Sequence, residues 1–194
     1  MKASSDIDTL SRCIILFIID ALDSMQGAKM GTVNSAIKEL LPELKDISES
    51  NLDVALYIGA VKVSNSIRWL YHDLTRAEDF VWHDFHAGGD RNLGTALFEL
   101  GKRLQYGGFF EDGVDYFKPI TFLLTDGISS DDYTVGLNLL KGNSIFQNAI
   151  KVGVSIGDAA DRIFLSEFVG DEDHVITVHT SESLKKWIRF EDLE

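Results

Sequence analysis

The sequence predicts an α/β domain built on a doubly wound, mostly parallel sheet. Two apolar runs, within residues 13–19 and 118–125, do not alternate with polar residues. Such runs are typical of strands that helices cover on both faces. Each run is followed by an aspartate, Asp20 or Asp126, and segments with helical periodicity separate the predicted strands. This alternation of strands and helices is the pattern of parallel βα units.

The other elements follow from apolar spacing and from turn residues. Apolar residues at three-and-four spacing predict a helix over 29–44. The next two strands are separated by a connection too short for a parallel crossover, so we expect an antiparallel hairpin. The expected order is a strand at 13–19, a helix at 29–44, strands at 52–61 and 66–71, a short strand or extended loop at 80–85, a helix at 93–105, a surface loop at 107–117, a strand at 118–125, a helix at 133–140, a strand at 150–156, a helix at 159–168, a strand at 174–178 and a helix at 182–190.

These elements predict a six-stranded sheet in the order 3-2-1-4-5-6, with one antiparallel strand and helices on both faces. The chain has 194 residues and shows no internal repeat or linker. We therefore expect one domain over residues 1–194.

Charge and cysteine content narrow the class of protein. Lys and Arg number 18 and Asp and Glu 31, which gives a net charge of −13. This charge repels nucleic acids and anionic membranes, so we expect neither as a partner. No apolar run reaches the roughly 20 residues that a membrane-spanning helix needs. The single cysteine, Cys13, permits no intrachain disulfide, which favours a reducing, cytoplasmic location.

Asp20 and Asp126 form the candidate site. Ligands of open α/β sheets bind beyond the carboxyl ends of the central strands, where we expect these two side chains to be neighbours. Adjacent carboxylates in a cleft stay ionised when a cation or a basic side chain lies beside them. Ser24 adds a hydroxyl in the loop that follows Asp20. Oxygen ligands of this kind suit Mg²⁺, Ca²⁺ or Mn²⁺, so Asp20, Ser24 and Asp126 are the candidate metal ligands.

Three segments in this order resemble the von Willebrand factor type A domain family: residues 20–25 (Asp-Ala-Leu-Asp-Ser-Met), 88–94 (Gly-Gly-Asp-Arg-Asn-Leu-Gly) and 124–127 (Leu-Thr-Asp-Gly). The resemblance implies the family's fold and its metal-ion-dependent adhesion site (MIDAS). Segments 151–157 and 168–170 and the ending 187–190 resemble the bacterial, cytoplasmic TerY-type branch associated with tellurium resistance. That branch implies a stress-response or defence setting, with protein kinases or phosphatases among the partners.

Two positions depart from the family's ligand pattern. Leu22 stands where the family has its first serine, and a leucine side chain coordinates no metal. Asp90 and Arg91 replace the usual threonine of the glycine-rich loop: an alignment on the preceding glycines puts Asp90 there, and one on Asn92 puts Arg91 there. We therefore expect a degenerate MIDAS that binds Mg²⁺, Ca²⁺ or Mn²⁺ weakly or not at all. Our hypothesis is that the Arg91 guanidinium neutralises the aspartates in place of a metal.

The resemblance favours a non-catalytic, intracellular module that binds a protein partner. The alternative is a metal-dependent hydrolase or phosphatase that uses Asp20 and Asp126. Catalysis also needs a group that transfers protons, and no His, Lys or Glu evidently accompanies the two aspartates in the sequence, which favours binding. The loops converging on the crevice supply the expected partner-binding residues, which are Asp23, Met25, Asp90, Arg91 and Ser129.

Overall fold

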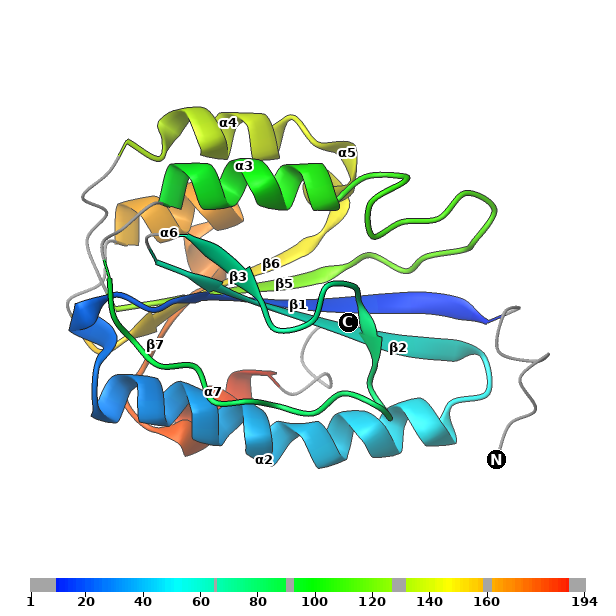
Figure 1. Ribbon diagram of the computed structural model, residues 1–194, viewed down its shortest axis with the longest axis horizontal. Helices are drawn as coiled ribbons and strands as arrows, with labels where there is room; N and C mark the ends of the chain where they lie inside the picture. The colour runs from blue at the N-terminus through cyan, green and yellow to red at the C-terminus, as the bar shows by residue number, and fades with distance from the viewer. Residues whose placement is uncertain (1–9, 65, 90–92, 127–131, 159–161, 189–194) are drawn as a thin grey trace.

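The computed structural model describes residues 10–64, 66–89, 93–126, 132–158 and 162–188. Strands alternate with helices along most of this length (Figure 1). In chain order the elements are β1 (Ser11–Asp20), η1 (Asp23–Met25), α2 (Ala28–Ser50), β2 (Val54–Val63), β3 (Ile67–Trp69), β4 (Thr75–Arg76), α3 (Leu93–Arg103), β5 (Ile120–Thr125), α4 (Thr134–Lys141), α5 (Ser144–Asn148), β6 (Ile150–Ile156), α6 (Arg162–Val169), η2 (Glu172–His174), β7 (Val175–Val178) and α7 (Ser181–Ile188).

The sheet has the predicted order. Its strands run β3-β2-β1-β5-β6-β7, which corresponds to 3-2-1-4-5-6 of the sequence prediction. β1 pairs in parallel with both β2 and β5, and β5, β6 and β7 continue the parallel arrangement. β3 is antiparallel to β2, as the short connection requires. The predicted fold class is confirmed.

The structure differs from the prediction in its short elements and in one helix end. β4 is a seventh strand, two residues long and antiparallel to β2, so two strands rather than one are antiparallel. α5 has five residues and was not predicted. Elements of two and five residues are too short to show an apolar periodicity in the sequence. Residues 80–85 form an extended loop, and α2 continues six residues beyond the predicted end at Leu44.

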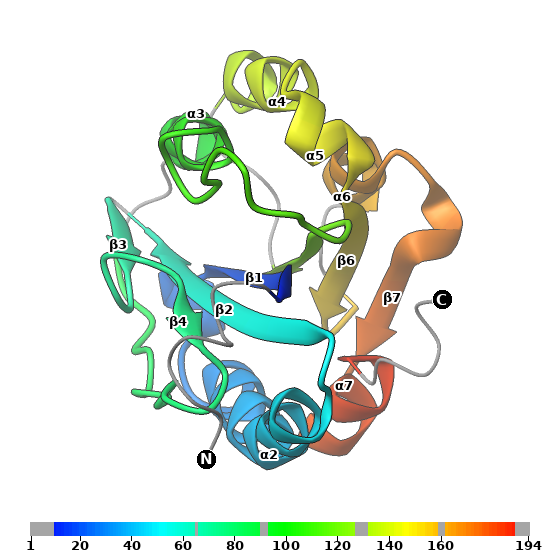
Figure 2. The same ribbon diagram turned by 90° about the vertical axis from the view of Figure 1, so that its right-hand side faces the viewer.

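Helices cover both faces of the sheet and make two hydrophobic cores (Figure 2). α2 and α7 pack against one face, while α3, α4, α5 and α6 lie over the other. Because successive strand residues point to opposite faces, β1 contributes to both cores. Its buried residues are Ile15, Phe17 and Ile19 in the first core and Ile14, Leu16 and Ile18 in the second.

A buried asparagine fastens the loop at 80–86 to α2. Asn34 is 8% exposed, and its Nδ2 donates to the carbonyl oxygen of Phe85 at 2.9 Å. Its Oδ1 accepts from Trp82 Nε1 at 3.1 Å and from the Phe85 backbone N–H at 3.0 Å. One side chain thus satisfies three polar groups of the loop. The loop leads directly to Gly88 and Gly89, which contact the candidate site.

The single cysteine lies at the start of β1, where it packs against the first core. Burial raises the pKa of the Cys13 thiol to about 11. The thiol is therefore neutral at physiological pH and a poor nucleophile. This agrees with its interpretation as a small apolar residue of the strand.

Candidate functional site

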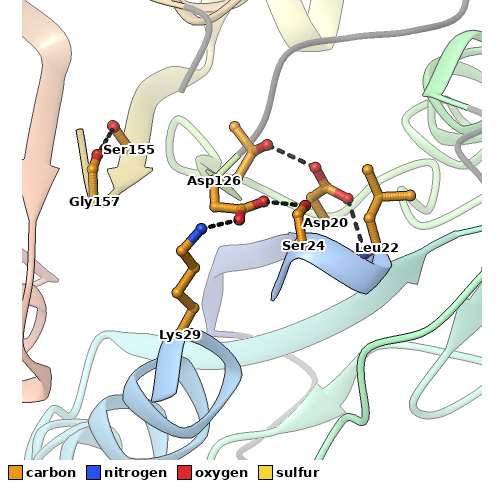
Figure 3. A network of polar contacts seen from close by, with 8 residues as sticks. Asp20, Leu22, Ser24, Lys29, Asp126, Ser155 and Gly157 are labelled. Atoms are coloured by element: carbon orange, nitrogen blue, oxygen red, sulfur yellow. Dashed lines mark hydrogen bonds and ion pairs between the residues drawn. The ribbon is translucent and has the colours of Figure 1, made fainter. Parts of the chain in front are cut away.

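Asp20 and Asp126 lie side by side where the two central strands end. Asp20 is the last residue of β1, and Asp126 directly follows β5. The two strands are parallel neighbours, in a register that pairs Ile19 with Leu124. Both aspartates are buried, with 6% and 2% of their surface exposed. Figure 3 shows their carboxylates within one network of polar contacts.

The Asp20 carboxylate accepts hydrogen bonds at both oxygens. Its Oδ1 accepts from the backbone N–H of Leu22 at 3.3 Å. Its Oδ2 accepts from the Thr125 hydroxyl at 2.6 Å. Thr125 is the β5 residue next to Asp20 in the parallel register, so the pairing of β1 with β5 itself places this donor. Donors to the charged form stabilise a buried carboxylate.

The Asp126 carboxylate also has a donor on each oxygen. Ser24 Oγ donates to Oδ1 at 2.8 Å, and Lys29 Nζ forms an ion pair with Oδ2 (Figure 3). The Asp126 side chain is fully buried, whereas the Lys29 side chain is 38% exposed. The ion pair therefore joins a buried charge to one that reaches the protein surface.

The turn between β1 and α2 brings Ser24 and Lys29 to Asp126. η1 carries Ser24, and Gly27 then adopts φ = 73°, a conformation that favours glycine. α2 begins at the next residue, which places Lys29 in the first helical turn. The structure corrects the interpretation of Met25 as a partner-binding residue. Its side chain is fully buried in the first core because it packs under this turn, so it offers no surface to a partner.

The glycine-rich loop reaches the same turn through its backbone. The N–H of Gly88 donates to the carbonyl oxygen of Ala21 at 2.8 Å. The N–H of Gly89 donates to Asp23 Oδ1 at 3.3 Å, and Gln26 Nε2 donates to the same oxygen at 3.0 Å. Asp23 is exposed at the rim, and its role in partner binding stays a prediction. The other expected rim residues, Asp90, Arg91 and Ser129, lie outside the described residues.

The described side chains at this site do not fit a divalent cation. Asp20, Ser24 and Asp126, the predicted ligands, do come together, but Leu22 contributes an apolar side chain beside them. The Lys29 ammonium already occupies one oxygen of Asp126, and its positive charge repels a cation there. No group of three or more His, Cys, Asp or Glu side chains within the described ranges is placed to hold a metal ion.

Sequence reasoning missed two groups of the network. One is Thr125, whose hydroxyl donates to Asp20. The parallel pairing of the two apolar strands could have predicted this contact, because it places the residue before Asp126 beside Asp20. Lys29 is a basic residue close to the aspartates, which the sequence reasoning did not recognise. It lies nine positions after Asp20, and the tight turn at Gly27 folds it back toward the strand ends.

Comparison with known proteins identifies relatives of this fold. The model of the von Willebrand factor type A domain matches residues 15–189. No curated protein sequence matches the chain.

Solved structures show the same fold at low sequence identity. Proximal thread matrix protein 1 of the mussel byssus has a TM-score of 0.65 at 17% identity, over 92% of this chain and 46% of its own. A von Willebrand factor type A protein from Catenulispora acidiphila has a TM-score of 0.64 at 19% identity, over 91% and 41%. A second structure of the mussel protein, with a TM-score of 0.64 at 18% identity over 92% and 46%, has a zinc-occupied MIDAS motif. This chain thus spans less than half the length of these proteins.

Proposed function

The chain belongs to the von Willebrand factor type A domain family, and from this we propose that it is a non-catalytic module that docks a protein partner. Domains of this family commonly mediate protein–protein interaction. The docking surface in our proposal is the rim above Asp20 and Asp126, at the carboxyl ends of β1 and β5.

One observation carries this proposal: two buried carboxylates lie at the strand ends, held in place by donors of the chain itself. Leu22, Ser24, Thr125 and Lys29 supply these donors. These hydrogen bonds and the ion pair hold the two carboxylates rigidly at the strand ends. Above it, Asp23 is exposed and tied to the glycine-rich loop. The rim residues of our proposal are Asp23, Asp90, Arg91 and Ser129.

The cellular setting of the proposal rests on sequence. Resemblance of segments 151–157 and 168–170 to the TerY-type branch supports a cytoplasmic role in a bacterial stress-response or defence system. A protein kinase or phosphatase of the same system is the partner that this resemblance favours. The net charge of −13 argues against nucleic acid as a partner. Within the described residues, every helix is too short or too polar to span a bilayer.

Site-specific photo-cross-linking tests where a partner docks. A photoreactive residue replaces Asp23 at the rim, and in a matched variant it replaces Asp112, an exposed aspartate in the loop near Tyr116. Tyr116 forms an isolated backbone β-bridge with Arg12, which lies at the end of β1 opposite to Asp20. In the native host we expect a protein adduct from position 23 that Arg91→Glu weakens. An adduct of equal yield from position 112, or one from that position alone, would place the interface elsewhere.

The hydrolase alternative is tested by turnover. Lys29 adds a basic group that the sequence reasoning lacked, but its ammonium donates to Asp126 as a counter-ion. A group held this way is poorly placed to move a proton to or from a substrate. We expect the purified protein to hydrolyse neither generic phosphomonoesters nor nucleotides, with or without Mg²⁺. Turnover that disappears in Asp20→Asn would reverse the ranking of the two functions.

A further inference from the structure

The family's adhesion site implies a divalent cation beside the two aspartates. In the described part of this chain a lysine side chain, Lys29, lies beside Asp126 instead. We propose that the Lys29 ammonium permanently takes the place of the cation as the counter-charge of Asp126. The site then keeps its geometry without a metal. Four observations support this assignment: the burial of Asp126, the donors on both carboxylates, the position of Lys29 at a helix start, and the side chain at position 22.

Burial makes a counter-charge necessary. The Asp126 side chain is fully buried, and an ionised carboxylate removed from water is costly unless it is paired and hydrogen-bonded. Lys29 supplies the pairing charge at Oδ2, and Ser24 supplies the hydrogen bond at Oδ1. The described chain therefore meets both requirements at Asp126 with its own side chains.

Asp20 is held in the same manner, by the Leu22 N–H at one oxygen and the Thr125 hydroxyl at the other. All four carboxylate oxygens of the site thus accept a hydrogen bond or an ion pair from the chain. A carboxylate oxygen has two lone pairs, so these donors alone do not exclude a cation. The deciding difference is the positive charge of Lys29.

The position of Lys29 on its helix indicates that Asp126 holds it there. Lys29 lies in the first turn of α2, and this turn contains no acidic residue. A positive charge near a helix N-terminus is unfavourable, because the helix dipole is positive at that end. The ion pair compensates for this cost and directs the ammonium toward the Asp126 carboxylate at the strand ends (Figure 3).

A divalent cation at Asp126 would lie next to the Lys29 ammonium and the Leu22 side chain. The ammonium would have to leave its carboxylate or remain within a few ångström of the incoming charge. The buried Leu22 adds no oxygen that compensates for the loss. The positive charge of Lys29 therefore disfavours a divalent cation at the native site. Removal of this charge makes the oxygens of Asp20, Ser24 and Asp126 available to a cation.

Titration with Mn²⁺ tests the assignment. Lys29→Met removes the charge and keeps an unbranched side chain. The matched control is Lys38→Met on the same helix, where Lys38 pairs with the exposed Asp84 at 2.6 Å. By calorimetry we expect the natural protein and Lys38→Met to bind no Mn²⁺ at this site. Lys29→Met should gain binding at least about tenfold tighter than the weakest affinity that the titration of the natural protein would detect, because a nearby unit charge is removed. Asp126→Asn added to Lys29→Met should abolish the gain.

Thermal unfolding provides a second readout that needs no tight binding, since a ligand of the folded state raises Tm. Mn²⁺ should raise the Tm of Lys29→Met, and of Lys29→Gln as a second neutral variant, but not that of Lys29→Arg. Two results would overturn the assignment: Mn²⁺ binding by the natural protein as tight as by Lys29→Met, or no response to Mn²⁺ in either neutral variant.

This inference rests on the proposed docking function and adds that the docking site needs no metal. Its test uses the protein and Mn²⁺ without a partner. Failure here leaves the cross-linking result at the rim unaffected, and failure of the cross-linking leaves the metal titration unaffected.

Discussion

Replacement of Ile18 by aspartate is expected to leave no stably folded protein. Ile18 is 2% exposed in the central strand β1, two residues before its end, where it pairs with Val61 on one side and Leu123 on the other. A carboxylate there has no water and no partner among these apolar neighbours. The cost, several kcal/mol from desolvation and lost packing, is comparable to the roughly 5–15 kcal/mol that stabilises a typical domain. Circular dichroism should show no cooperative thermal transition.

The matched control is Ile163→Asp, the same substitution at a position that is 72% exposed at the start of α6. Surface changes of this kind cost within about 0.5 kcal/mol, so its Tm should stay within roughly 2 °C of the natural protein. A soluble Ile18→Asp variant that melts cooperatively near the control's Tm would show that β1 is not the centre of the core.

Asn34→Ala should cause the second largest loss of stability. The change removes three hydrogen bonds. The buried Trp82 indole N–H and the Phe85 backbone N–H and carbonyl oxygen then lose their hydrogen-bond partner. Unsatisfied buried groups cost about 1–3 kcal/mol each, and we expect a total of roughly 2–4 kcal/mol. Urea unfolding should show this loss, with a Tm lowered by about 5–15 °C.

Asn148→Ala provides the comparison for Asn34. Asn148 is exposed, and its Nδ2 donates to the Ser144 carbonyl oxygen at 3.0 Å within one short helix. Water replaces that hydrogen bond, so the loss should stay below about 1 kcal/mol. Equal losses in the two variants would mean that Asn34 does not anchor the loop at 80–86.

The sheet order was predictable because its determinants are local. Two continuous apolar runs identified the central strands β1 and β5, and a short connection fixed the antiparallel β3. The aspartates at the ends of the two apolar runs located the candidate site, since parallel neighbours end at the same edge of a sheet. These inferences needed only apolar pattern and connection length.

The parts that sequence reasoning missed depend on contacts between distant residues. The last turns of α2 lack an apolar pattern, yet the helix continues to Ser50. There, Ser48 is buried and accepts from the Leu56 N–H at 3.3 Å. Met25 follows two exposed residues in a polar loop, and only the packing of the turn shows that it is buried.

The counter-charge of the aspartates shows the same limit. The sequence offered Arg91 as the neutralising group because that residue replaces a family threonine, but its position lies outside the described residues. The structure places the Lys29 ammonium on Asp126 instead of leaving this carboxylate to an outside cation. This contact joins residues 97 positions apart, which no periodicity or motif in the sequence encodes.

The central claim is that Lys29, a residue of the chain itself, supplies the counter-charge of Asp126 at the strand ends. Anomalous diffraction from crystals grown with Mn²⁺ tests it most directly, because the anomalous signal locates manganese independently of the protein atoms. We predict the Lys29 ammonium on Asp126 and no manganese peak between Asp20 and Asp126. A manganese peak between the two carboxylates, with Lys29 turned away from Asp126, would contradict the claim and restore an ordinary metal-dependent adhesion site.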